Sequence, residues 1–143
     1  MRQILLLFLA GFAVLFALLL SGCALSKAKE DKAEDMPDKA AYHKISAEEA
    51  YEMMASQEVV VVDVRTREEY DGGHIENAVL VPNESIGSET PEALPDKEAT
   101  LLVYCRSGRR SKDAAQKLLE LGYQSVYDFG GVIDWPYELV KEG

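Results

Sequence analysis

A continuous run of β-branched residues, Val59-Val60-Val61-Val62 followed by Asp63 and Val64, constrains the fold of this chain most strongly. A strand with one face exposed to solvent alternates apolar and polar residues, whereas this run shows no alternation. Strands that are covered on both faces are typical of parallel sheets with helices packed on either side. The run therefore predicts a buried strand of a parallel sheet.

Strand and helix signals alternate from Tyr42 onward. Ser46 is followed three positions later by Glu49, a capping-box pattern that predicts the start of a helix. The same pattern recurs at Thr66 and Glu69, before a shorter helix that the Gly72-Gly73 pair would end. Alternating elements of this kind predict an α/β domain with helices on both faces of a mostly parallel sheet. The other expected elements are strands at 78–81, 100–104 and 125–129, a connection at 83–97 with one short helical turn, and a helix at 111–121.

The N-terminal segment has the features of an export signal. Arg2 precedes an uninterrupted apolar run at 4–20, and an uncleaved membrane anchor is the alternative. Leu20-Ser21-Gly22-Cys23 resembles the bacterial lipobox, whose cysteine is diacylated and becomes the first residue after cleavage. The resemblance implies an exported protein that an N-terminal lipid holds at the cell membrane or at the periplasmic face of a bacterial membrane.

These patterns divide the chain into three parts. Residues 1–22 are expected to be a lipoprotein signal peptide, and residues 42–143 one folded domain. Residues 23–41 are the lipidated Cys23 and a segment rich in Lys, Glu, Asp and Ala, which predicts a flexible, solvated tether.

Charge and cysteine content restrict the function. The formal net charge is −10, so nucleic acid is not an expected partner. Arg106, Arg109 and Arg110 nevertheless lie close together, which favours a small anionic ligand. The two cysteines, Cys23 and Cys105, lack metal-ligand and Cys-x-x-Cys spacing, so neither a metal nor a cofactor is expected. A disulfide between them is the alternative in an exported protein.

Cys105 follows a predicted strand directly and precedes a predicted helix, at the sheet edge where open α/β folds bind ligands. Loop amides, the positive end of the helix and nearby guanidinium groups would all lower the pKa of its thiol. The same amides would cradle an anion, and Gly108 would allow the tight turn. We expect a thiolate at neutral pH, the alternative being a small buried apolar residue.

A resemblance to the active-site loop of thiosulfate-type rhodaneses covers Tyr104-Cys105-Arg106-Ser107-Gly108-Arg109-Arg110-Ser111. The upstream signature of that family resembles Asp63-Val64-Arg65, Glu69-Tyr70 and Gly73-His74-Ile75, and its C-terminal signature resembles Gly130-Gly131 with Trp135. The resemblance extends over residues 42–143. It implies a rhodanese-like domain with a mostly parallel, five-stranded sheet and helices on both faces.

The length of the loop separates two activities that share this fold. Related dual-specificity phosphatases place an arginine after five intervening residues, whereas Ser111 occupies that position here and Arg110 comes one residue earlier. The shorter loop resembles the rhodanese version, which fits a single sulfur atom. Phosphatase or arsenate-reductase activity is therefore a lesser alternative.

The resemblance implies a sulfurtransferase in which the Cys105 thiolate takes the outer sulfur of thiosulfate or a similar donor, and the persulfide then passes it to a thiol or cyanide. The expected donor-binding residues are Arg106, Ser107, Gly108, Arg109 and Arg110. Arg109 and Arg110 could instead be a solvated flank of the helix. The alternative function is a non-catalytic module that binds sulfide or persulfide or docks a partner at the membrane.

Five further residues are expected to have structural roles. The resemblance implies that Asp63, Arg65 and Glu69 form ion pairs that brace the loops near the site. His74 is expected to be a hydrogen-bonded loop residue rather than a base for Cys105. Trp135 is expected to be a core or cleft-lining aromatic.

Overall fold

The structure is a computed structural model, and it describes residues 41–141. The predicted signal peptide, the predicted lipid site at Cys23 and the tether up to residue 40 lie outside the described residues, as does a disulfide to Cys23. Within residues 41–141, none of the helices has the length and apolar character that crossing a membrane requires.

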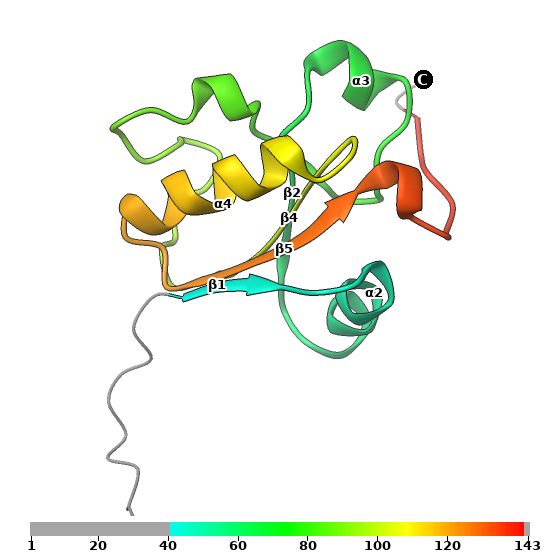
Figure 1. Cartoon of the computed structure of the whole chain (residues 1–143), viewed down its shortest axis with the longest axis horizontal. Coiled ribbons are helices and arrows are strands. Elements are labelled where there is room, and N and C mark those ends of the chain that lie inside the picture. Colours follow the sequence, from blue (N-terminus) through cyan, green and yellow to red (C-terminus); the bar gives the residue numbers. More distant parts are fainter. Residues whose placement is uncertain (1–40, 142–143) are drawn as a thin grey trace, which may run out of the picture. The chain divides into compact units, whose positions relative to one another are not determined.

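A five-stranded sheet forms the centre of the domain (Figure 1). Its order is β1-β5-β4-β2-β3, and every pair of neighbouring strands is parallel. The predicted α/β class and the buried β2 and β4 are confirmed, and the sheet is wholly rather than mostly parallel. The strands are β1 (Ala41–Lys44), β2 (Val60–Asp63), β3 (Val79–Leu80), β4 (Thr100–Cys105) and β5 (Ser125–Gly131).

Helices cover both faces of the sheet, with α4 on one side and α2 on the other (Figure 1). Both predicted capping boxes are present, because Ser46 and Thr66 each cap a helix whose third residue is a glutamate that bonds back. The predicted short turn in the connection is the helix η1. The helices are α2 (Ala47–Ser56), α3 (Arg67–Asp71), η1 (Asn83–Ser85), α4 (Arg109–Glu120) and η2 (Val132–Asp134).

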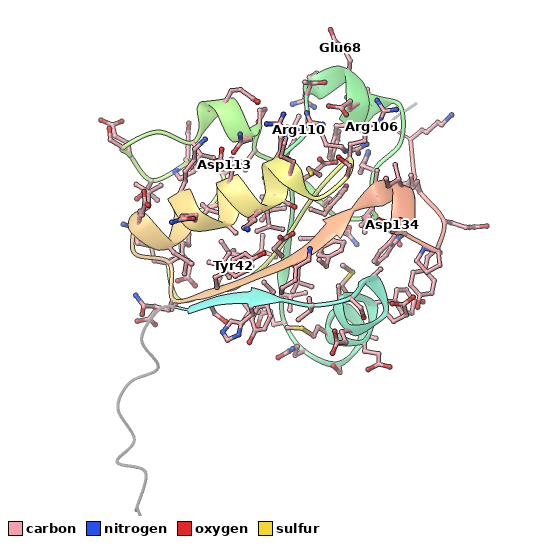
Figure 2. The ribbon with its side chains drawn as sticks, in the orientation of Figure 1. Tyr42, Glu68, Arg106, Arg110, Asp113 and Asp134 are labelled. Atoms are coloured by element: carbon pink, nitrogen blue, oxygen red, sulfur yellow. The ribbon has the colours of Figure 1, made fainter. Side chains whose placement is uncertain are left out.

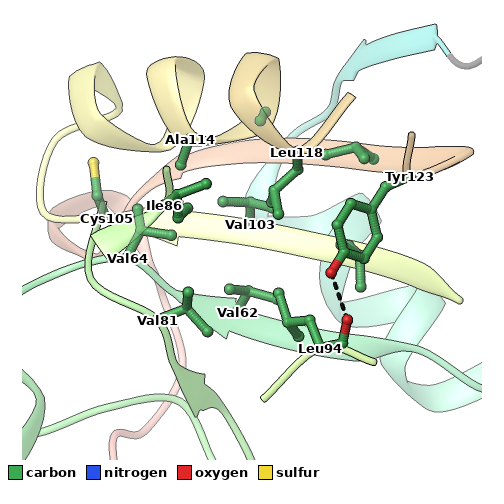
Figure 3. Close-up of a cluster of buried hydrophobic side chains, with 13 residues drawn as sticks. Val62, Val64, Val81, Ile86, Leu94, Val103, Cys105, Ala114, Leu118 and Tyr123 are labelled. Atoms are coloured by element: carbon green, nitrogen blue, oxygen red, sulfur yellow. Dashed lines mark hydrogen bonds between the residues drawn. The ribbon is translucent and has the colours of Figure 1, made fainter. Parts of the chain in front are cut away.

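Two buried clusters pack on the two faces of β4. Val103 and Cys105 belong to the cluster beneath α4, which Figure 3 shows, and Tyr104 belongs to the cluster on the α2 side. Successive side chains of a strand point to opposite faces, so β4 is covered on both sides. Cys105 therefore projects from the end of the central strand toward the α4 side.

Candidate active site

Cys105 is the last residue of β4, and its side chain is only 1% exposed. The backbone N–H of Gly108 donates a hydrogen bond to its Sγ at 3.1 Å, and the hydroxyl oxygen of Ser111 lies 3.7 Å from the same atom. Figure 3 shows the sulfur beside the start of α4. The loop 105–110 thus wraps closely around one sulfur atom.

Two glycines allow the loop to take this shape. Gly108 has a φ of 94°, a left-handed conformation that favours glycine, and it caps α4. The helix consequently begins at Arg109, two residues before the predicted start. Gly131 lies directly beneath the loop, where a Cβ atom would overlap the carbonyl oxygen of Arg106 and lie 2.6 Å from the Cα of Ser107. Gly131 was expected only as part of a motif, and this packing role was not predicted.

The hydrogen bonds around Cys105 outweigh the effect of burial on its acidity. Burial by itself raises the pKa of the thiol. The amide and hydroxyl of Ser111 and the amides of Ser107 and Gly108 lower it, and the net pKa is below the ordinary value for cysteine. This is the direction that the sequence predicts, and backbone amides supply much of the effect.

Ser111 contributes to the site in a way that the sequence did not reveal. Its side chain is fully buried, and its hydroxyl oxygen lies 3.1 Å from the carbonyl oxygen of Gly108 and 3.2 Å from that of Gly130. The Ser111 hydroxyl can donate only one hydrogen bond, and three acceptors lie near it: these two carbonyl oxygens and the Cys105 sulfur. It can therefore donate to the sulfur once the thiol has lost its own proton.

The three arginines of the loop differ in their surroundings. Arg106 and Arg109 are exposed and form no ion pair with any of residues 41–141. Arg110 donates two hydrogen bonds to Glu69 of α3, at 2.7 and 2.8 Å. Figure 2 labels Arg106 and Arg110 at the edge where α3 and the start of α4 meet. Arg110 is thus held by a carboxylate, while Arg106 and Arg109 are free to meet a ligand.

The residues expected to brace the site do so. Asp63 and Arg65 form a buried ion pair at 2.6 Å, and Arg65 also donates to the carbonyl oxygen of Gly73 at 2.8 Å. Glu69 forms the second ion pair, and the hydrogen bonds from Arg110 lower its pKa to about 2. The predicted scaffold roles are confirmed.

His74 and Trp135 also lie where the sequence places them. The buried His74 ring stacks on Tyr70 at 3.6 Å, and its Nδ1 lies 3.0 Å from the carbonyl oxygen of Tyr70. His74 is therefore a hydrogen-bonded loop residue. The Trp135 ring packs on Phe129, with centroids 5.6 Å apart, and lines a cavity.

The residues described by the structure offer no group of three His, Cys, Asp or Glu side chains that could hold a metal ion. Around Cys105, the structure brings together a thiol with a lowered pKa, the amides and hydroxyl next to it, and the exposed Arg106 and Arg109. Such a set suits nucleophilic attack on an electrophile that carries negative charge.

Solved structures similar to this chain carry the same architecture. One described as a rhodanese with anions, from E. coli, is 35% identical, with a TM-score of 0.54, and the match covers 59% of this chain and 100% of that one. A rhodanese-like domain protein from Staphylococcus aureus is 30% identical, with a TM-score of 0.61, over 71% and 99% of the two chains. A human single-domain sulfurtransferase is 26% identical, with a TM-score of 0.58, over 64% and 93%.

Curated relatives include a tRNA uridine(34) hydroxylase from Yersinia pestis, which is 31% identical over 106 residues, or 71% of this chain. The chain spans about 30% of the length of that relative. The family model described as Rhodanese-like domain matches residues 46–136, which is more than half of the chain and includes the whole Cys105 loop. With this match and the shared architecture, the chain belongs to the rhodanese-like domain family.

Proposed function

We propose that this protein is a sulfurtransferase that moves sulfane sulfur from thiosulfate or a similar anionic donor to a thiol or cyanide, through a persulfide on Cys105. The observation that carries the proposal is the Cys105 thiol, whose pKa is lowered by amides that converge on its sulfur. A thiolate is the nucleophile that sulfur transfer needs. The exposed Arg106 and Arg109 supply positive charge for the donor.

The first half of the reaction loads the sulfur. The Cys105 thiolate attacks the outer sulfur of thiosulfate, a new S–S bond forms, and the S–S bond within thiosulfate breaks. Sulfite leaves with the electron pair of that bond. The persulfide remains as an anion, and the N–H groups of Ser107 and Gly108 are placed to stabilise it.

The second half unloads the sulfur. A thiolate or cyanide attacks the outer sulfur of the persulfide, and the bond between the two sulfur atoms breaks. The electron pair returns to Cys105 as a thiolate, which the Gly108 amide and the Ser111 hydroxyl can again stabilise. The cycle needs only one cysteine, and Cys105 is the free cysteine of the described residues.

The geometry favours sulfur transfer over phosphate transfer. The related phosphatases carry an arginine after five intervening residues, but the small Ser111 occupies that position here, and Arg110, one residue earlier, is held by Glu69. The Gly108 amide lies 3.1 Å from Sγ, so the loop closes around the sulfur.

Similar proteins also support sulfur transfer as the activity. The similar structures include the human single-domain sulfurtransferase, which the match covers to 93% of its length. The tRNA uridine(34) hydroxylase matches over only 30% of its length, and the net charge of −10 disfavours a tRNA partner for this chain. We therefore do not extend hydroxylation to this protein.

We also propose that the protein is exported and held at a membrane by a lipid on Cys23. The support is the order of Arg2, the apolar run and Leu20-Ser21-Gly22-Cys23. The tether would place the sulfurtransferase domain outside the cytoplasm, near the lipid surface.

Mass spectrometry of the intact protein tests the sulfurtransferase proposal. Thiosulfate should add the mass of one sulfur atom and release one sulfite, cyanide should remove the sulfur as thiocyanate, and Cys105→Ser should abolish both changes. A protein that accepts sulfur but never passes it on would be a binding module instead. A wild type that gains no sulfur from thiosulfate or from any small persulfide would refute the proposal.

A further inference from the structure

An open cavity of about 880 Å³ lies on the α2 side of the sheet, whereas Cys105 belongs to the cluster on the α4 side. We call it the aromatic groove. It is lined by Tyr51 of α2, by Trp135 and Tyr137 after η2, and by Glu76 and Glu138. Its volume lies in the range of small-molecule sites, roughly 300–1,000 Å³. No part of the Cys105 loop contributes to its lining.

Three aromatic rings gather at the surface of this groove. Tyr51 and Tyr137 stack with ring centroids 3.9 Å apart, and Trp135 meets Tyr137 edge-on at 5.0 Å. Tyr51 is 46% exposed and Tyr137 is 38% exposed, so the pair lies at the surface, and the outer face of each stacked ring is the one left for a ligand. The faces of such rings carry partial negative charge and attract cations.

All the charged residues that line the groove are acidic. Glu76 and Glu138 line it, and no lysine, arginine or histidine does. Neither carboxylate forms an ion pair with another of the described residues. The groove therefore combines negative ring faces with two unpaired carboxylates, and both features favour a positively charged ligand.

We propose that the aromatic groove binds a small organic cation, such as a quaternary ammonium group on an apolar body. Among the described residues, no group of three His, Cys, Asp or Glu side chains gathers at the groove as a metal site would require. A weakly hydrated organic cation instead gains from ring faces and from apolar contacts with Met54 and Ile75. This proposal does not rest on the proposed sulfur transfer, because no residue of the Cys105 loop lines the groove.

Tryptophan fluorescence can report the binding directly, since Trp135 is the single tryptophan of the chain. The full-length protein is titrated with choline and with 3,3-dimethylbutan-1-ol, which has the same shape but no charge. Choline should give a saturable change, and the neutral alcohol should bind at least about tenfold more weakly. Equal affinity for the two probes, or no saturable response to choline, would overturn the proposal.

A pair of double variants isolates the role of the groove carboxylates. Glu76→Gln with Glu138→Gln should weaken choline binding by about tenfold. Glu89→Gln with Glu92→Gln removes the same two charges from an exposed segment outside the groove and should leave binding unchanged. Equal weakening by both pairs would show only an effect of net charge and would contradict the site. Persulfide formation on Cys105 should be unaffected in both, so the outcome is separate from that of the sulfurtransferase test.

Discussion

At the level of single residues, Cys105 combines near-complete burial with a lowered pKa. Burial by itself favours the neutral thiol, so the thiolate depends on hydrogen bonds that reach the sulfur. These come from Ser107, Gly108 and Ser111, and the positive charge of Arg110 also interacts with Cys105. Cys105 could be found from the sequence because it follows a buried strand and precedes three arginines. The role of Ser111 could not, because it depends on where α4 begins.

Ser111→Ala should raise the pKa of Cys105, because it removes the hydroxyl that can donate to the thiolate. We expect the midpoint of the pH profile for alkylation by iodoacetamide to rise by about one unit. Below the midpoint the thiolate becomes protonated and the rate falls, so the variant should lose reactivity at a higher pH than the wild type. The exposed Ser88→Ala is the control, and an unchanged midpoint in Ser111→Ala would contradict this role.

Arg106 and Arg109 are predicted to attract the anionic donor. Replacing both with Ala should raise the KM for thiosulfate by about tenfold or more, since charge-assisted contacts contribute about 1.5–3 kcal/mol each. The rate of alkylation by iodoacetamide, which is uncharged, should change much less and is the internal control. A KM equal to that of the wild type would show that neither arginine contacts the donor.

At the level of secondary structure, the sequence predicts those elements whose signals are local. The capping boxes identify α2 and α3, and the apolar runs identify β2 and β4. β1 was not identified, because Ala41-Tyr42-His43-Lys44 has no apolar run and becomes a strand by pairing with β5. Long-range pairing of this kind leaves no pattern in the segment itself.

The ion pair between Glu69 and Arg110 ties α3 to α4, and its contribution should depend on pH. The pKa of Glu69 is lowered to about 2, below its ordinary value of 4.5, so the pair stabilises the fold fully above pH 4.5 and loses this effect as the pH falls toward 2. Glu69→Gln should lower the free energy of unfolding at pH 7 by about 2 kcal/mol. In this variant the free energy of unfolding should also fall less than in the wild type as the pH drops from 4.5 toward 2.

Glu49→Gln is the matched control for this variant. Glu49 forms the same kind of capping box as Glu69 but has no arginine partner among residues 41–141. Urea unfolding at several pH values measures both variants. Similar losses at pH 7 would assign the effect to helix capping rather than to the contact between α3 and α4.

Gly131→Ala tests the contact between β5 and the Cys105 loop. The added Cβ would overlap the carbonyl oxygen of Arg106, so the loop or the strand would have to move. We expect a loss of about 2 kcal/mol in the free energy of unfolding, together with a marked loss of sulfur loading on Cys105. Gly87→Ala is the control, because a Cβ there meets no atom within 4 Å. Normal sulfur loading in Gly131→Ala would show that the loop adapts.

For the whole molecule, the main prediction is that a lipid on Cys23 holds the domain at a membrane. If Cys23 is the lipid site, Cys23→Ser should leave an uncleaved precursor without acyl groups. Metabolic labelling with a radioactive fatty acid, followed by measurement of the intact mass, compares the variant with the wild type. Cys105→Ser, which should still be labelled, is the control. A wild type that takes up no label would exclude the lipid anchor.

The sheet order has a consequence for how the protein is made. β1 lies at the edge of the sheet and pairs with β5, the last strand of the chain, so this contact closes only after Ser125–Gly131 has been synthesised. Before β5 is synthesised, the part of the chain that has left the ribosome lacks the strand that lies between β1 and β4. Until β5 emerges, β1 therefore has no neighbour in the sheet and cannot take its place at the edge.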